Sequence, residues 1–139
     1  MKLDIIKKIE KIIGKKNIVL SENGKKKYLT EWRNRFPGEA KAILKPKNVK
    51  EVSLLMKIFN KENISVVPQG GNTGLVGGQI SYSDQHFIIS FERMNKLIKF
   101  NKEDQSMIVQ SGMLLSDIQN ICDENDMYFP LSLASEGSC

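Results

Sequence analysis

Cysteine and histidine are nearly absent from this sequence, which contains Cys122, Cys139 and the single histidine His86. The two cysteines form no CxxC pair and no disulfide framework. With so few nitrogen and sulfur ligands, a metal site is not expected. His86 has no orienting partner in the sequence, so we interpret it as an ordinary strand-edge residue rather than a catalytic base. Cys139 is expected to serve packing.

Aromatic residues are also scarce, at 7% of the 139 residues, although the net charge is +5. A surface that stacks nucleic-acid bases needs aromatic side chains interleaved with basic ones. The densest lysine runs, at 7–8, 15–16 and 25–27, lack such interleaving. We interpret the lysines as solvated surface and expect no nucleic-acid partner.

Long apolar runs are missing as well. Residues 1–16 are amphipathic and interrupted by charges, unlike a signal peptide or a membrane span. We expect no membrane span and a cytoplasmic location. The hydrophobic fraction of 40% and charged fraction of 27% are typical of one globular domain.

The first half of the chain predicts a β-α-β unit. Isoleucines at helical spacing before Gly14 predict a first helix, and the polar stretch 21–40 is expected to be a long loop. A strand at 42–46 precedes a helix that starts at the capping signal of Asn48 and Glu51. The β-branched run 64–68 predicts the second strand.

The second half contains three short apolar runs, at 86–90, 96–100 and 106–112, which favour an antiparallel meander. A final helix is expected from residue 114 to 122. The predicted fold class is therefore α+β, a small β-α-β unit with its helices on one face, followed by antiparallel strands and a helix. The sheet is incomplete, and its open edge and apolar face make self-association plausible.

The stretch VVPQGGNTGLVGGQ, residues 66–79, contains five glycines directly after a predicted strand. Successive backbone N–H groups in such a loop can form an anion-binding concavity. Asn72 can hold the turn or a ligand oxygen, and Thr73 adds a hydroxyl donor. The loop matches neither GxxxxGK[ST] nor a GxGxxG that opens a helix, which excludes the common nucleotide motifs. A tight turn without a ligand remains the alternative.

Several segments resemble one known family in the same order. VVPQGGNTGLVGG is similar to the diphosphate-binding loop of the FAD-binding domain shared by vanillyl-alcohol oxidase and p-cresol methylhydroxylase (PCMH) relatives, within the D-2-hydroxyglutarate and D-lactate dehydrogenase branch. The stretch from LTEWRNRF to VPQGG resembles the family's entry segment, SFERMN its strand after the loop, and FPLSLASEGSC its second flavin-contacting stretch. The similarity extends over residues 28–139.

The resemblance implies FAD as the cofactor and assigns residues to it. The glycine-rich loop 68–78 would hold the FAD diphosphate, with Gln69 and Val76 facing either ligand or core. Trp32 is expected to be structural and Arg33 to lie on the surface, with a substrate contact as the alternative. Arg93 is expected to brace the strand and turn. The residues expected to line the cofactor are Pro68, Gly70, Gly71, Asn72, Thr73, Gly74, Leu75, Gly77, Gly78, Pro130, Leu131, Gly137 and Ser138.

The family's dehydrogenases are several times longer than this chain. Residues 1–139 are therefore expected to be the N-terminal portion of a PCMH-type FAD-binding domain, without the substrate or cap domain. The implied function is the FAD-binding portion of a flavin-dependent D-2-hydroxyacid dehydrogenase. Its partners would be FAD and the rest of the parent enzyme, which alone would bind the small 2-hydroxyacid. No catalytic residue is assigned, and the chain by itself is expected to be inactive. The alternatives are a non-catalytic anion- or nucleotide-binding module, or a fragment without activity.

Overall fold

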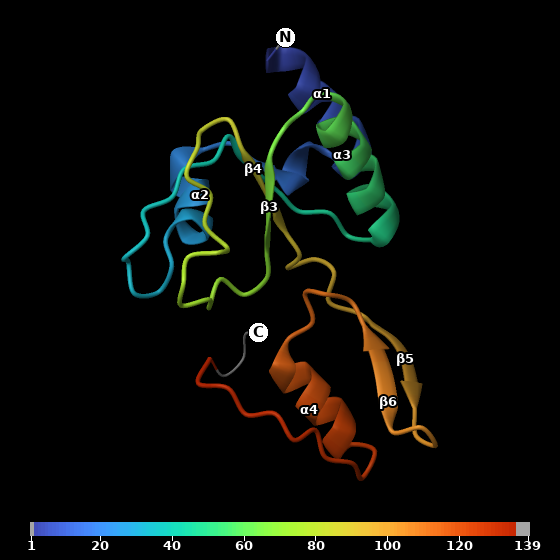
Figure 1. Cartoon of the computed structure of the whole chain (residues 1–139). Coiled ribbons are helices and arrows are strands. Elements are labelled where there is room, and N and C mark those ends of the chain that lie inside the picture. The colour runs from blue at the N-terminus through green and yellow to red at the C-terminus, as the bar shows by residue number, and fades with distance from the viewer. Residues whose placement is uncertain (1, 136–139) are drawn as a thin grey trace.

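The computed structural model describes residues 2–135 of the chain. The described segment folds into two lobes (Figure 1). The elements of the first lobe are α1 (Lys2–Ile13), a 3-10 turn η1 (Lys15–Asn17), β1 (Ile18–Val19), α2 (Glu22–Leu29), β2 (Ala42–Leu44), α3 (Val49–Lys61), β3 (Val66–Gln69) and β4 (Phe87–Ser90). The second lobe contains β5 (Leu97–Asn101), β6 (Ser106–Val109) and α4 (Leu115–Asp123). Its last described segment, 124–135, runs beside α4.

The first lobe is built on a four-stranded sheet of order β1-β2-β4-β3. Strands β2 and β3 both pair with β4 in parallel, while β1 is antiparallel to β2. The α+β fold class is confirmed, but the run at 86–90 does not belong to an antiparallel meander. All four residues of β4 are buried, as is typical of a parallel strand covered on both faces.

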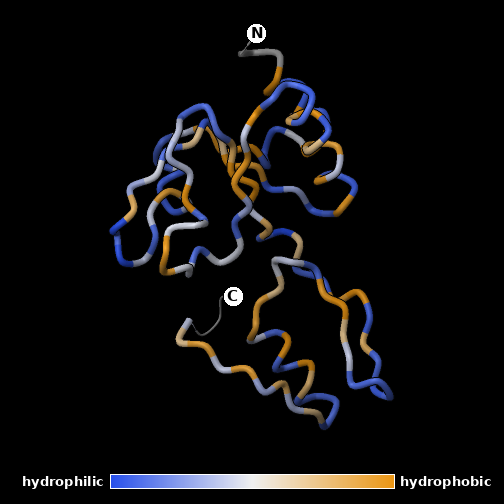
Figure 2. The backbone as a smooth tube through the Cα atoms, in the orientation of Figure 1, coloured by the Kyte–Doolittle hydropathy of each residue, from blue (hydrophilic) through white to orange (hydrophobic). Residues whose placement is uncertain are grey.

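Helices cover both faces of this sheet: the two predicted helices, α1 and α3, lie on one face as expected, and the unpredicted α2 lies on the other. Helices α1 and α3 pack on one face, where Leu55 and Phe59 of α3 meet Phe87 and Ile89 of β4. The opposite face packs Ile88 of β4 against Tyr28 of α2 and other apolar residues. Figure 2 shows the apolar residues gathered along the strands between these helices.

Helix α2 was not expected, because its sequence ENGKKKYL is almost entirely polar. Ser21 caps it by accepting a hydrogen bond from the Gly24 N–H at 3.3 Å. Lys25 and Tyr28, three residues apart, face inward and are buried. The Lys25 ammonium donates to the Ala40 carbonyl at 2.8 Å, which satisfies its buried charge together with Glu22 at 2.7 Å. Tertiary contacts therefore stabilise a helix that local propensity does not predict.

The second lobe consists of the β5–β6 hairpin, whose strands are antiparallel as expected, and α4. The hairpin exposes apolar side chains, with Ile98 and Ile108 about 60% accessible. The lobes join where the chain crosses itself, and there the Gly112 N–H donates to the Met94 carbonyl at 2.8 Å. A Cβ atom on Gly112 would lie 1.8 Å from the Phe91 carbonyl oxygen, so only glycine fits at this crossing.

Candidate functional site

The candidate site lies at the edge of the sheet where β3 and β4 end. Because the two strands are parallel, the glycine loop 70–79 after β3 and the turn 91–95 after β4 emerge side by side. Ligands of open α/β sheets bind outside the carboxyl ends of the strands. A cavity of about 260 Å³ opens at this edge, lined by Gly70, Gly71, Glu92, Asn95, Gly112 and Leu114. Three of these six residues are glycines, which bring backbone rather than side chains to the cavity.

The loop backbone is polarised, with carbonyl groups engaged and N–H groups available. Within residues 2–135, no backbone N–H of residues 72–79 donates a hydrogen bond. In contrast, side-chain donors hold three loop carbonyls. Gln79 Nε2 binds the Gly74 oxygen at 2.8 Å, Arg35 Nη2 the Leu75 oxygen at 3.0 Å and Gln69 Nε2 the Gln79 oxygen at 3.0 Å. A row of N–H donors without protein acceptors is the property an anion-binding loop needs.

Asn72 fastens the middle of the loop to the end of α2. Its backbone is left-handed, with φ of 58°, a conformation that asparagine tolerates better than most residues. Its side-chain Nδ2 donates to the Lys27 carbonyl at 3.1 Å and to the Thr30 carbonyl at 2.9 Å. The sequence left open whether this amide holds the turn or a ligand; in the structure it holds the turn. Its Oδ1 is buried and has no partner within the described residues, so a hydrogen-bond donor is still missing there.

The two positions that the sequence left undecided differ sharply. Gln69 is buried at 2% exposure, and its Nε2 also donates to the Tyr28 carbonyl at 2.8 Å. Val76 is 87% exposed. Gln69 therefore belongs to the core that supports the loop, whereas Val76 lies on the outer surface.

The glycines of the loop differ in what they require. Gly77 has φ of +77°, and a Cβ there would lie 2.8 Å from the Tyr82 hydroxyl and 3.1 Å from the Phe36 ring. At Gly74 a Cβ would lie 2.6 Å from the Gln79 side chain, whereas Gly78 faces open space. Gly77 is thus a structural requirement of the loop, and Gly78 is free of such a constraint.

Glu92 brings a negative charge to the cavity, but three groups neutralise it. Its carboxylate accepts from the Tyr28 hydroxyl at 2.8 Å and pairs with Lys45 at 3.2 Å and Lys27 at 3.5 Å. Partial burial raises the pKa of Glu92, but the Tyr28 hydrogen bond and the two lysines outweigh it, so the pKa lies below its ordinary value. Burial and the bond to Glu92 raise the pKa of Tyr28, so its phenol stays protonated and donates. Sequence reasoning missed this cluster, because its members come from three separate segments.

Arg93 acts as the expected brace. Its Nη1 donates to the Lys45 carbonyl at 2.7 Å, which ties the turn after β4 to the segment after β2. Its neighbour Glu92 binds the Lys45 ammonium. Two adjacent residues of the turn therefore hold the same lysine by its backbone and its side chain.

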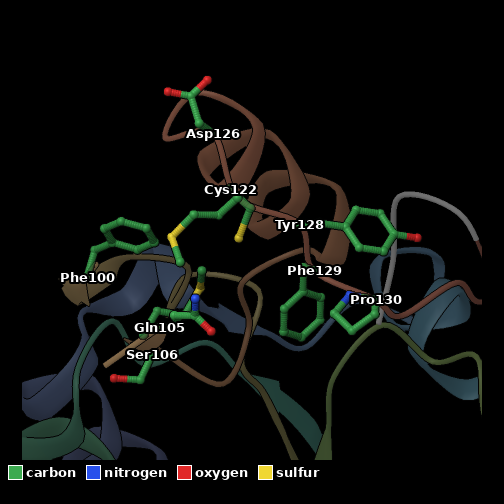
Figure 3. Close-up of a pocket in the computed structure, with 10 residues that line it drawn as sticks. Phe100, Gln105, Ser106, Cys122, Asp126, Tyr128, Phe129 and Pro130 are labelled. Carbon is green, nitrogen blue, oxygen red and sulfur yellow. The ribbon is translucent and has the colours of Figure 1, made fainter. Parts of the chain in front are cut away.

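The expected second flavin-contacting stretch is placed only in part. Pro130 lines a larger cavity of about 710 Å³ between β6, α4 and the segment 126–130, together with Phe100, Cys122 and Phe129 (Figure 3). The Leu131 carbonyl accepts from Gln119 of α4 at 2.8 Å. Within residues 2–135, no hydrogen bond joins Pro130 or Leu131 to the glycine loop. Gly137 and Ser138, like Cys139, lie outside the described residues.

The other chemically versatile residues lie away from this edge. His86 directly precedes β4, at the opposite end of the strand from the candidate site. Across residues 2–135, no group of three or more His, Cys, Asp or Glu side chains could hold a metal ion. None of the helices in the same range is long and apolar enough to cross a membrane.

Comparison with known proteins identifies the family. The sequence profile of the FAD-binding domain family matches residues 40–139, which includes the glycine loop and both sides of the cavity. The chain belongs to this family. FAD, the cofactor implied by the resemblance, is therefore confirmed for the domain.

Relatives and solved structures agree with this assignment. The FAD-binding domain is 34% identical to a mitochondrial D-2-hydroxyglutarate dehydrogenase of Arabidopsis thaliana, over 94% of this chain and 23% of the relative. It is 36% identical to a D-2-hydroxyglutarate dehydrogenase of Xanthomonas citri, over 81% of this chain and 24% of the relative. A protein of Schizosaccharomyces pombe, provisionally named a mitochondrial D-lactate dehydrogenase, is 37% identical over 78% of this chain and 20% of that protein.

Among solved structures, p-cresol methylhydroxylase shares the fold with a TM-score of 0.80 at 20% identity, over 96% of this chain and 27% of the enzyme. Alkyldihydroxyacetonephosphate synthase matches with a TM-score of 0.80 at 16% identity, over 88% of this chain and 25% of the synthase. The PCMH-type fold is therefore confirmed. The chain spans about a quarter of the length of the curated relatives it matches.

Substitution of two neighbouring glycines should separate the requirements of the loop. We expect Gly77→Ala to lower the free energy of unfolding by at least about 1 kcal/mol, because alanine is disfavoured at positive φ and meets Tyr82. Gly78→Ala, the matched control, should stay within about 0.5 kcal/mol of the parent chain. Urea unfolding followed by circular dichroism measures both. Equal losses in the two variants would contradict this account of the loop.

Acidification should test the Glu92 cluster. Because the pKa of Glu92 is lowered by folding, its contribution is present above its ordinary value of 4.5 and is lost as the pH falls through the lowered pKa. Glu92→Gln should reduce the unfolding free energy at pH 7 and weaken its decline below pH 4.5. Glu103→Gln, on an exposed turn, is the control. Unfolding curves from pH 3 to 7 that are parallel in Glu92→Gln and the parent would count against the cluster.

Proposed function

We propose that the glycine loop holds the diphosphate of FAD, and that the chain is the cofactor-binding portion of a flavin-dependent D-2-hydroxyacid dehydrogenase. The observation that carries the first part is the row of backbone N–H groups at 72–79, which have no acceptor among residues 2–135. These donors follow directly on a parallel strand, at the sheet edge where such folds bind ligands. The profile match to the FAD-binding domain family supports the identity of the ligand.

The residues present fit a dinucleotide. Backbone donors of the loop can bind phosphate oxygens without side chains in the way, and Gly70, Gly71 and Gly112 leave the adjoining cavity open to the cofactor. The carboxylate of Glu92 would repel a diphosphate, but Lys45, Lys27 and the Tyr28 hydroxyl compensate its charge.

For the parent enzyme we propose a D-2-hydroxyacid of the lactate or 2-hydroxyglutarate type as substrate. The names of the relatives support this substrate class. Bound FAD supplies a hydride acceptor for oxidation at carbon 2 of such an acid. Residues 1–139 would contribute the N-terminal part of the cofactor site, and the rest of the parent chain would bind the substrate. On this proposal, the isolated chain binds FAD but does not oxidise hydroxyacids.

We propose the cytoplasm as the compartment. The Arabidopsis relative is named as mitochondrial, whereas the name of the Xanthomonas relative gives no compartment. Fractionation of cells that express the full parent protein distinguishes the two, because recovery with mitochondria would overturn the cytoplasmic assignment.

A titration with three nucleotides tests the assignment of the loop. The chain should bind FAD and ADP, which carry a diphosphate, more tightly than FMN, which does not. Gly71→Asp places a carboxylate beside the cavity and should weaken the binding of both FAD and ADP by about ten-fold or more. Asn60→Asp, on the exposed side of α3, makes the same charge change away from the loop and should have no effect. Calorimetry or flavin fluorescence provides the dissociation constants.

The outcome also separates the alternative functions. Equal binding of FAD, FMN and inorganic phosphate would favour a general anion-binding module. Binding of none of them, by the chain and by its full parent, would contradict the assignment altogether. If the full-length enzyme binds FAD but the isolated chain does not, Gly71→Asp is made in the full-length enzyme. The loop assignment then requires that this substitution weakens FAD binding there.

We further propose that the rest of the parent chain covers the outer face of the β5–β6 hairpin. The exposed Ile98 and Ile108 and the unpaired strand edges support this. In isolation the chain should therefore self-associate. Lysine at both positions should give a monomer in sedimentation analysis, whereas Leu20→Lys, an exposed leucine on the first lobe, should not. If the isolated, unsubstituted 139-residue chain is monomeric at all concentrations, this proposal is ruled out.

A further inference from the structure

The segment 31–36 forms a tight turn around the carboxylate of Glu31. Glu31 is 1% exposed; its Oε2 accepts the Arg33 N–H at 2.6 Å and its Oε1 accepts the Arg35 N–H at 2.5 Å. Asn34 is left-handed, with φ of 52°, and its N–H donates to the Glu31 carbonyl at 2.8 Å. Burial raises the pKa of Glu31, but the hydrogen bonds and charges of Arg35 and Arg33 together outweigh burial, so the pKa lies below its ordinary value and the carboxylate stays charged. Hydrogen bonds to an ionised acceptor are strong, and they hold this turn in one geometry.

The turn presents two side chains to the glycine loop, forty residues further along the chain. Arg35 Nη2 donates to the Leu75 carbonyl at 3.0 Å. The ring of the adjacent Phe36 lies 3.1 Å from the position of a Cβ on Gly77. The Glu31 turn therefore supports the rim of the loop by one hydrogen bond and one packing contact.

The hydrogen bond from Arg35 has a directional consequence. In a trans peptide, the carbonyl of one residue and the N–H of the next point in opposite directions. The described chain contains no cis peptide. With the Leu75 carbonyl directed at Arg35, the Val76 N–H must point away from the guanidinium, and this N–H has no acceptor in the described chain.

We propose that Arg35 is a positioning residue of the cofactor loop, which orients the Val76 N–H toward the ligand by holding the Leu75 carbonyl. This inference rests on the proposed function, because it names the residue that orients one donor of the diphosphate site. Arg35 acts through the backbone and does not contact the diphosphate. The Glu31 carboxylate in turn positions Arg35.

The test compares three substitutions of one side chain. Arg35→Ala loses both the charge and the donor, Arg35→Lys keeps the charge, and Arg35→Gln keeps a neutral amide donor. Arg33→Ala is the matched control, since it removes the same charge from the same turn while its guanidinium lies over the Trp32 ring and not on the loop. Affinities for FAD and ADP are measured by calorimetry at several salt concentrations. Far-ultraviolet circular dichroism checks that each variant folds.

We expect Arg35→Ala to weaken FAD and ADP by about ten-fold, the loss of one charge-assisted hydrogen bond. Arg35→Gln should recover most of the affinity and keep the salt dependence of the unsubstituted chain. Arg33→Ala should bind FAD and ADP as the unsubstituted chain does. Recovery by Arg35→Lys alone, with a shallower salt dependence in Arg35→Gln, would show direct contact with the phosphates and overturn the proposal. Unchanged affinity in Arg35→Ala would overturn it as well.

A measurement without ligand separates this inference from the proposed function. Backbone ¹⁵N relaxation should show faster motion of residues 74–77 in Arg35→Ala than in the unsubstituted chain and in Arg33→Ala. If neither the unsubstituted chain nor the full-length enzyme binds FAD or ADP, the proposed function fails. If binding of both nucleotides is observed and the loop of Arg35→Ala is as ordered as in the unsubstituted chain, only the role of Arg35 fails.

Discussion

The parallel pairing of β4 between β2 and β3 is the constraint on which the site depends. A central strand that is buried throughout needs cover on both faces, which α3 and α1 provide on one face and α2 on the other. The same pairing brings the carboxyl ends of β3 and β4 to one edge of the sheet. The strand pairing alone therefore brings the glycine loop next to the turn that carries Glu92. Helix α2 then serves twice, since its last turn also receives the Asn72 amide.

Ordering a loop so rich in glycine costs conformational entropy, and the structure shows what offsets it. The stabilising groups are side chains of Gln69, Gln79, Asn72 and Arg35, and each donates to a backbone carbonyl in or beside the loop. None of them uses a backbone N–H of the loop. The protein thus fixes the loop through its carbonyl acceptors, and the N–H groups of residues 72–79 have no acceptor within residues 2–135. The lysines around Glu92 offset the negative charge of its carboxylate.

Local sequence signals predicted those parts of the fold that local energetics decide. The capping pair Asn48 and Glu51 marked the start of α3, since the Glu51 N–H donates to Asn48 at 2.8 Å, and the glycine loop was evident from composition. The failures were α2 and the pairing of β4. Helix α2 is held by a buried lysine and by Tyr28, whose partner Glu92 lies 64 residues away. The unbroken apolar run of β4 did carry a signal for a parallel strand, whereas β6 alternates in burial as a hairpin strand does. For the site, motif resemblance indicated the loop, but no local pattern could reveal that Arg35 reaches Leu75.

The crossing at Gly112 implies an uneven tolerance to evolutionary change within the second lobe. The hairpin tip near Asp104 is an exposed turn, where chains commonly accept insertions and deletions. The hairpin can therefore lengthen or shorten between homologues without disturbing either lobe. At residue 112, even the smallest side chain would collide with the main chain of Phe91. Sequence changes in this lobe are therefore tolerated at the hairpin tip. At the point where the two lobes meet they are not tolerated, because there is no room for even one methyl group.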